Sequence, residues 1–165
     1  MKAIRILGKE RMSESGASSQ FSTLDFSFAE ILHNIEELVS ELYWAHTGII
    51  YSFPESLTQE QYNITKRNLE EYLLHEDKAR SINYMHRGFI ENFGQYIFSE
   101  WVELAGYDDI QKLKTFDPTD SDSIEENAVV FFRCVDAAYW AVYAKNEEII
   151  NILESNFKFT ETIGT

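Results

Sequence analysis

The sequence predicts an all-α fold: a single-domain bundle of about five or six helices with a mobile N-terminal tail. Three observations support this class. Apolar residues recur at three- and four-residue steps, candidate caps separate the periodic segments, and the chain contains neither an internal repeat nor a recognisable ladder of strands. Its 165 residues are the size of one domain. We therefore expect residues 1–20 to form the tail and residues 21–165 a single α-helical domain.

The N-terminal part of the chain contains the predicted tail and the first two predicted helices. Residues 13–19 are rich in serine, which favours mobility, and only the short run Ile4–Leu7 before them resembles a strand. Residues 25–51 carry apolar side chains at helical spacing, so we expect one long helix there. A second helix is expected over 58–75, because Thr58 stands three residues before a glutamine in the pattern of a capping box.

The remaining predicted elements follow from caps and composition. Gly106 is a natural C-terminal stop for a long third helix. Ser123 begins a second capping box, and the segment after it is apolar on most sides, which predicts a central helix. Asn146 interrupts that helix and precedes a last amphipathic one. The expected segments are a helix over 77–106, a short helix and an acidic turn over 107–123, and helices over 123–145 and 147–157.

The charge of the chain is its best functional clue. It has 28 acidic and 14 basic residues, a net charge of −14, and from Met12 to Thr65 it contains eight acids and no lysine or arginine. This balance argues against nucleic acid as the main ligand, since that binding requires cations, and it favours a basic protein partner. With 44% hydrophobic residues the chain is folded rather than a disordered acidic polymer.

Cysteine usage and hydropathy indicate the compartment. The single cysteine, Cys134, lies in an apolar run and is expected to be a buried thiol in a reducing environment. No stretch approaches the roughly 18 apolar residues of a spanning helix, and the N-terminus lacks the pattern of a signal peptide. We expect a cytoplasmic protein that does not bind membranes.

Few residue patterns point to metal, nucleophile or ligand chemistry. Glu30 and His33 have the Glu-x-x-His spacing of di-iron bundles, but the sequence has no second pair, and Glu30 belongs to a polar stripe. Cys134 is too apolar in its surroundings to favour a thiolate. The aromatic pairs Tyr43–Trp44 and Tyr139–Trp140 suit a core, an interface or a pocket. A small-molecule or metal-binding bundle is therefore an alternative, and our main expectation is no enzyme activity, no metal and no cofactor.

A second alternative comes from the segment Arg80–His86. It resembles the arginine-to-histidine motif of HEPN ribonucleases, which are small all-α bundles. The resemblance implies that Arg80 holds a phosphate of RNA and that His86 handles the proton at the 2′-oxygen. It covers these seven residues and the predicted fold class. A purely structural interpretation of the same residues is that His86 packs at the boundary of the core and that Arg80 forms a surface ion pair with Glu76.

The most economical interpretation is an acidic protein-binding inhibitor. In charge, size and predicted helix content the chain resembles immunity proteins and antitoxins, which neutralise basic, nuclease-type toxins. That resemblance implies carboxylates that pair with the cations a toxin uses to hold nucleic acid. The acidic turn and the helix start after it are the first candidate contact surface, and a helical face with Glu37 and Glu41 is the second. The first set comprises Asp108, Asp109, Asp117, Asp120, Asp122, Glu125 and Glu126, among which local roles are expected for Asp117 and Glu126.

Overall fold

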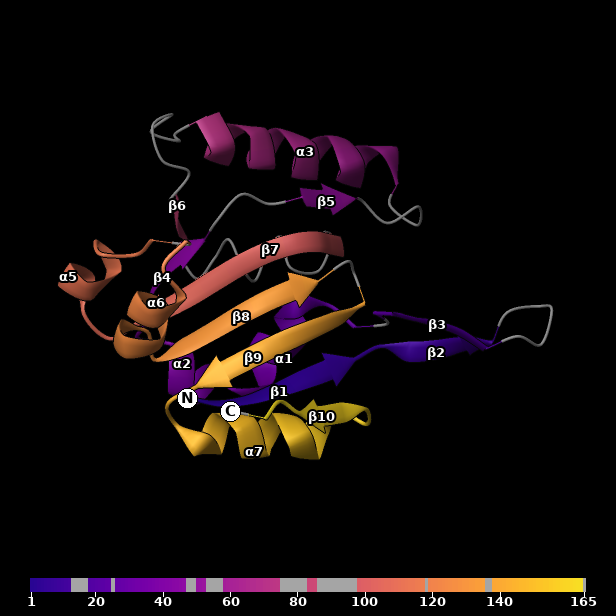
Figure 1. The fold of residues 1–165 in the computed structure, drawn as a ribbon. Helices are drawn as coiled ribbons and strands as arrows, with labels where there is room; N and C mark the ends of the chain where they lie inside the picture. Colours follow the sequence, from indigo (N-terminus) through magenta and orange to yellow (C-terminus); the bar gives the residue numbers. More distant parts are fainter. Residues whose placement is uncertain are drawn as a thin grey trace.

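The computed structural model of the chain is an α/β fold built on an antiparallel sheet, so the all-α prediction is wrong. The structure describes residues 1–12, 18–24, 26–46, 50–52, 58–74, 83–85, 98–117, 119–135 and 138–164. Within these ranges eight strands form one sheet in the order β10-β1-β9-β8-β7-β4-β6, with β5 also pairing with β7 (Figure 1). These strands are β1 (Lys2–Leu7), β4 (Tyr43–His46), β5 (Ile50–Ser52), β6 (Asn83–Met85), β7 (Phe98–Tyr107), β8 (Val130–Val135), β9 (Tyr139–Ala144) and β10 (Thr160–Thr162).

Strands β8 and β9 replace most of the central helix expected over 123–145. Burial alternates along β8. Phe132 and Cys134 are fully buried in the core beneath α1, α2 and α7, while Arg133 between them lies on the other face of the sheet. The segment is rich in valine and aromatic residues, which suit a pleated sheet. Its sequence resembles that of a buried helix because both faces of the sheet are partly covered there, so polar residues are scarce on both sides.

The helix expected over 77–106 is also wrong where the structure describes it, because residues 83–85 and 98–107 form β6 and β7. Gly106 does not end a helix. It lies in β7 opposite Trp44 of β4 and Val130 of β8. A Cβ atom at this position would come within 2.9 Å of Leu42 Cδ1 and 3.1 Å of Val130 Cγ1. Close packing between neighbouring segments therefore explains the glycine.

The N-terminal strand corrects the prediction of a tail over 1–20. Strand β1 pairs with β9 on one side and β10 on the other, and the side chains of Ile4 and Ile6 are completely buried. The strand-like run seen in the sequence is thus part of the sheet. It is followed by a separate two-stranded hairpin of β2 (Lys9–Met12) and β3 (Ser18–Thr23), which extends away from the main sheet (Figure 1).

Besides the short helix of the segment 107–123, three predicted helices are correct in whole or in part. The start of α3 (Gln59–Leu74) has the expected capping box, in which the Gln61 N–H donates to Thr58 Oγ1 (3.2 Å) and the Thr58 N–H to Gln61 Oε1 (3.0 Å). Helix α7 (Glu147–Asn156) follows Asn146, whose side chain caps it. The helix expected over 25–51 is shorter: α1 (Phe28–Asn34) and α2 (Glu36–Val39) meet at Ile35, and β4 and β5 follow.

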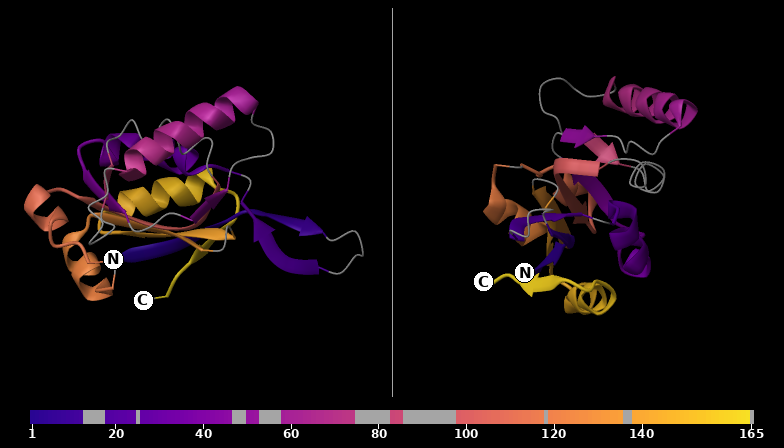
Figure 2. Two further views of the ribbon diagram at one scale, coloured as in Figure 1. Left: turned by 90° about the horizontal axis from the view of Figure 1, so that it is seen from above. Right: turned by 90° about the vertical axis from the view of Figure 1, so that its right-hand side faces the viewer.

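The helices cover the two faces of the sheet unequally. One face packs against α1, α2 and α7 through a large core that includes Ile31, Phe132 and Trp140. The opposite face is covered at one end by α5 (Ile110–Leu113) and α6 (Ser121–Asn127), whose Leu113 and Ile124 join a smaller core. Figure 2 shows α7 and α6 on opposite sides of the strands. None of the described helices is both long enough and apolar enough to cross a bilayer.

Candidate binding surfaces

The short helix and acidic turn predicted over 107–123 are present as α5 and the loop after it, and with α6 they form an acidic cap over residues 108–126. Two of its aspartates begin the helices. Asp109 accepts a hydrogen bond from the Gln111 N–H (2.7 Å), and Asp120 accepts one from the Ser123 N–H (2.9 Å). Helix α6 thus starts at Ser121 with Asp120 as its N-cap, so the capping box predicted from Ser123 and Glu126 is wrong.

Two further aspartates of the acidic cap have local partners. Asp117 accepts hydrogen bonds from the N–H (2.9 Å) and the hydroxyl (2.7 Å) of Thr119, which fits the local role expected for it. Asp108 lies 2.9 Å from Lys112 Nζ, one helical turn away. That hydrogen bond holds the pKa of Asp108 below its ordinary value and raises the pKa of Lys112. These carboxylates are partly engaged in shaping the cap.

The remaining acids of the cap lie on α6. Glu125 Oε1 is 3.0 Å from the α-amino group of Met1, and Lys145 Nζ donates to the backbone carbonyl of Glu126. Within the described ranges the carboxylates of Asp122 and Glu126 form neither a hydrogen bond nor an ion pair, and both residues are exposed. They stand four positions apart, so they share one side of the helix. They are the carboxylates of the cap best placed to meet another molecule.

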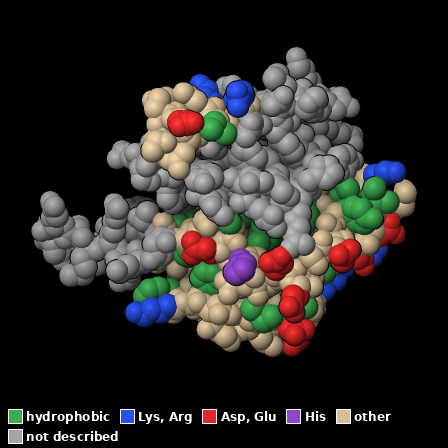
Figure 3. Space-filling model, turned by 180° about the vertical axis from the view of Figure 1, so that it is seen from behind, with side chains coloured by type: hydrophobic (Ala, Val, Ile, Leu, Met, Phe, Trp, Pro, Cys, Tyr) green, Lys and Arg blue, Asp and Glu red, His purple; other side chains and the backbone are tan. Residues whose placement is uncertain are grey.

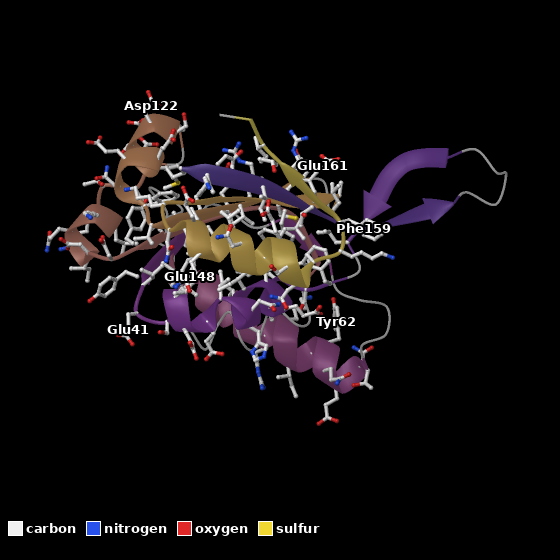
Figure 4. The ribbon with its side chains drawn as sticks, turned by 90° about the horizontal axis from the view of Figure 1, so that it is seen from below. Glu41, Tyr62, Asp122, Glu148, Phe159 and Glu161 are labelled. Atoms are coloured by element: carbon white, nitrogen blue, oxygen red, sulfur yellow. The ribbon has the colours of Figure 1, made fainter. Side chains whose placement is uncertain are left out.

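The second predicted surface does not join the first. Glu37 lies on α2 and Glu41 directly after it, and both are exposed. Helix α2 packs on the face of the sheet opposite to α6, and Figure 4 shows Glu41 and Asp122 pointing away on opposite sides of the strands. The rear of the molecule carries several separated acidic side chains rather than one dense group (Figure 3). A single partner contacting one side reaches only one of the two sets.

The metal and ribonuclease alternatives gain no support from the fold. Glu30 closes a capping box with Ser27 at the start of α1, and His33 is exposed, with Nδ1 3.6 Å from Glu36. In the part of the chain that the structure describes, no group of three or more histidine, cysteine or acidic residues is arranged to hold a metal ion. Arg80 and His86 lie outside the described residues, and the all-α fold implied by the HEPN resemblance is contradicted by the sheet.

The aromatic pairs separate into core and surface. Trp44 and Trp140 are buried, and the Trp140 ring stacks on Phe28 with centroids 4.6 Å apart. Tyr43 is 45% exposed, whereas Tyr139 is half-buried on the side of the sheet away from α7. Each pair therefore straddles the sheet, as adjacent residues of a strand must.

A surface that the acid-rich segments of the sequence do not predict lies on the half of the sheet beyond the acidic cap, and we call it the open face. It consists of two rows of residues that run across the strands. Within each row, neighbouring residues are paired on adjacent strands. The charged row is Glu161, Arg5, Ala141, Arg133 and Glu103. The apolar row is Leu7, Tyr139 and Val135, with Phe159 beside Leu7 through a hydrogen bond from the Leu7 N–H to the Phe159 carbonyl (2.9 Å).

The arginines of the charged row are each balanced by a glutamate. Arg133 Nε donates to Glu103 Oε1 (2.6 Å), and an Arg5 Nη atom lies 3.7 Å from a Glu161 oxygen. Both guanidinium groups also lie near aromatic rings: Arg5 is 5.2 Å from the Tyr139 centroid and Arg133 is 5.4 Å from the Phe131 centroid. The isolated arginines within the apolar runs of β1 and β8 were the sequence signal for this face, since they mark a two-residue alternation.

The chain matches no protein-family model, no curated protein and no solved structure.

Proposed function

We propose that the protein is an acidic protein-binding inhibitor of the immunity-protein or antitoxin kind, which neutralises a basic toxin without catalysing a reaction. The observation that carries the proposal is the acidic cap. Residues 108–126 contain seven acidic and two basic residues, and the carboxylates of Asp122 and Glu126 are unpaired within the part of the chain that the structure describes. In a chain of net charge −14, this end of the molecule is a strong attractor for cations.

Electrostatics explains how such an inhibitor acts. A nuclease holds its substrate with lysine and arginine side chains, and carboxylates placed over them compete for the same charges. Long-range attraction accelerates the encounter, while the apolar contacts of the interface set how long the complex lasts. We place this action in the cytoplasm, where Cys134, a fully buried residue, is kept as a thiol.

The proposal is tested by capture followed by an activity measurement. The immobilised protein is incubated with a lysate of its own source at low salt, and the retained protein is identified, purified and assayed for toxicity and nuclease activity. We expect a basic protein whose activity falls in proportion to added inhibitor and vanishes at equal molar amounts. A retained protein that stays fully active in excess inhibitor, or the absence of any basic protein, refutes the proposal.

A charge-reversal pair provides the matched control. Asp122→Lys with Glu126→Lys removes the exposed carboxylates of the cap, whereas Glu37→Lys with Glu41→Lys makes the same change in charge on the other side of the sheet. We expect the first variant to inhibit more weakly, by about tenfold or more, because charge pairs at an interface are strongly coupled. Equal losses in both variants indicate a response to net charge alone and contradict a contact at the cap.

A further inference from the structure

The open face is a sheet surface that no described helix covers. The reverse side of the sheet packs against α1, α2 and α7. On the same side as the open face, α5 and α6 cover only one end of the sheet. Figure 1 looks onto this side, where β8, β9 and β1 lie in front of α1 and α2. Antiparallel sheets that face water on one side are usually polar there. The apolar row departs from that pattern, since it places side chains of β1, β9 and β8 beside Phe159, the residue before β10.

Exposure within the apolar row is considerable. Leu7, Tyr139 and Val135 are half-buried, and Phe159 is 41% exposed. Tyrosine and phenylalanine are enriched in the centres of protein interfaces, where their large rings gain most from being removed from water. Arginine is enriched at such centres as well. The apolar row and the two arginines beside it therefore have the composition of an interface core.

The charges around the open face determine which partner fits. Within the charged row the two arginines are balanced by Glu103 and Glu161, so the row adds no net charge. At the border, α6 carries the exposed acids Asp122 and Glu126, whereas Lys158 lies over the Phe159 ring, with its Nζ 5.1 Å from the ring centroid, at the other end of the open face. Figure 4 shows Asp122 and Glu161 on the same side of the sheet, away from Glu41. Basic side chains on one edge of the partner are thus complementary to the α6 side of this face.

We infer that the open face and the adjoining α6 form one docking surface for the basic partner, which places cations against Asp122 and Glu126 and an apolar centre against the apolar row. The inference rests on the proposed function and names the surface that carries it out. A second copy of the chain is a poor occupant, because two molecules of net charge −14 repel each other. The rear surface is a poorer site for the partner, because the sheet beneath it is already covered by helices.

A peptide probe tests the surface before the partner is known. The full chain is labelled with ¹⁵N and titrated at low salt with a synthetic peptide of alternating arginine and leucine. Two control peptides replace every arginine with glutamine or every leucine with serine. We expect the largest shifts in α6, β1, β8 and β9, weaker binding of both controls, and loss of binding as salt rises.

Variants separate the two contributions. We expect Asp122→Lys with Glu126→Lys to raise the Kd of the arginine–leucine peptide by about tenfold. We expect Phe159→Ser, tested independently, to raise it by about threefold. Phe159 is exposed, so its replacement leaves the core intact. Glu37→Lys with Glu41→Lys is the control, because it makes the same change in net charge, and at the same low salt concentration it should change the Kd by no more than about twofold.

The outcomes distinguish failure of the inference from failure of the proposed function. Shifts centred on Glu37 and Glu41 overturn the docking surface but leave an inhibitor of a basic partner in place. Equal binding of the glutamine control also overturns it, because the occupant is then not selected by charge. Absence of binding anywhere on the protein overturns both. A dimer in sedimentation that dissociates when Tyr139 is replaced by serine assigns the face to a second copy and overturns it as well.

Discussion

Replacing Phe132 with alanine is the sharpest test of the position of β8 in the core. Phe132 is completely buried, and its ring centroid lies 5.2 Å from that of Phe28 and 6.0 Å from that of Trp44. Removal of the ring loses the transfer free energy of a large apolar side chain, leaves a cavity between the sheet and α1, and breaks two aromatic contacts. The expected loss in the free energy of unfolding is about 3–5 kcal/mol.

The loss is measured by urea denaturation, followed through tryptophan fluorescence. Because single domains are stable by only about 5–15 kcal/mol, Phe132→Leu serves as a milder variant that keeps the fold, with an expected loss of about 1–2 kcal/mol. Tyr43→Ala, at a residue that is 45% exposed, is the control and should cost less than about 1 kcal/mol. If Phe132→Ala cost no more than Tyr43→Ala, the side chain could not face the helix layer, and the described sheet would be wrong.

Three more predictions concern single groups. Burial raises the pKa of Tyr107 to about 12, so the stability it contributes is complete below its ordinary pKa of 10.0 and is lost as the pH rises towards about 12. The free energy of unfolding of the unmodified protein should therefore fall by about 2–3 kcal/mol between pH 10 and about 12 because of this group, and Tyr107→Phe should lack that fall. The same fall in both proteins contradicts the prediction. Gly106→Ala should destabilise by about 1–3 kcal/mol in urea, because the new methyl group meets Val130, which is fully buried; a neutral effect would show that the strands are farther apart. Asn146→Ala should cost about 1 kcal/mol by removing the cap of α7, with Asn146→Asp as the control that keeps an acceptor; equal losses in both would dismiss the cap.

Local signals in the sequence were enough to predict some helices and the acidic turn. The capping box at Thr58 depends only on residues three positions apart, and the apolar stripe of α7 repeats within a few turns. The stripe expected from Phe28 onward is also present, since Phe28, Ile31 and Ile35 are buried as predicted. The end of that stripe was not visible, because β4 is held in the sheet by pairing with β7, far along the chain. Tertiary pairing overrides local periodicity there.

The strands were hidden by the same feature that makes the sheet stable. In β8 and β9 apolar residues occupy both faces near the acidic cap, so the alternation that identifies a strand survives only at Arg133. A single arginine within six residues is a weak signal against a run of valine, phenylalanine and tryptophan. Consequently the acids of the cap could be predicted from the sequence, but the open face beside them could not, because it exists only once β10, β1, β9 and β8 are aligned.

The attraction of the partner to the carboxylates of α6 is tested most directly by the rate at which the purified partner associates with the protein at increasing ionic strength. We expect a rate that falls steeply with salt, by about tenfold or more, and that is lowered at low salt by Asp122→Lys with Glu126→Lys but much less by Glu37→Lys with Glu41→Lys. A rate that does not depend on salt, or that both reversals lower equally, contradicts a partner attracted by the carboxylates of α6.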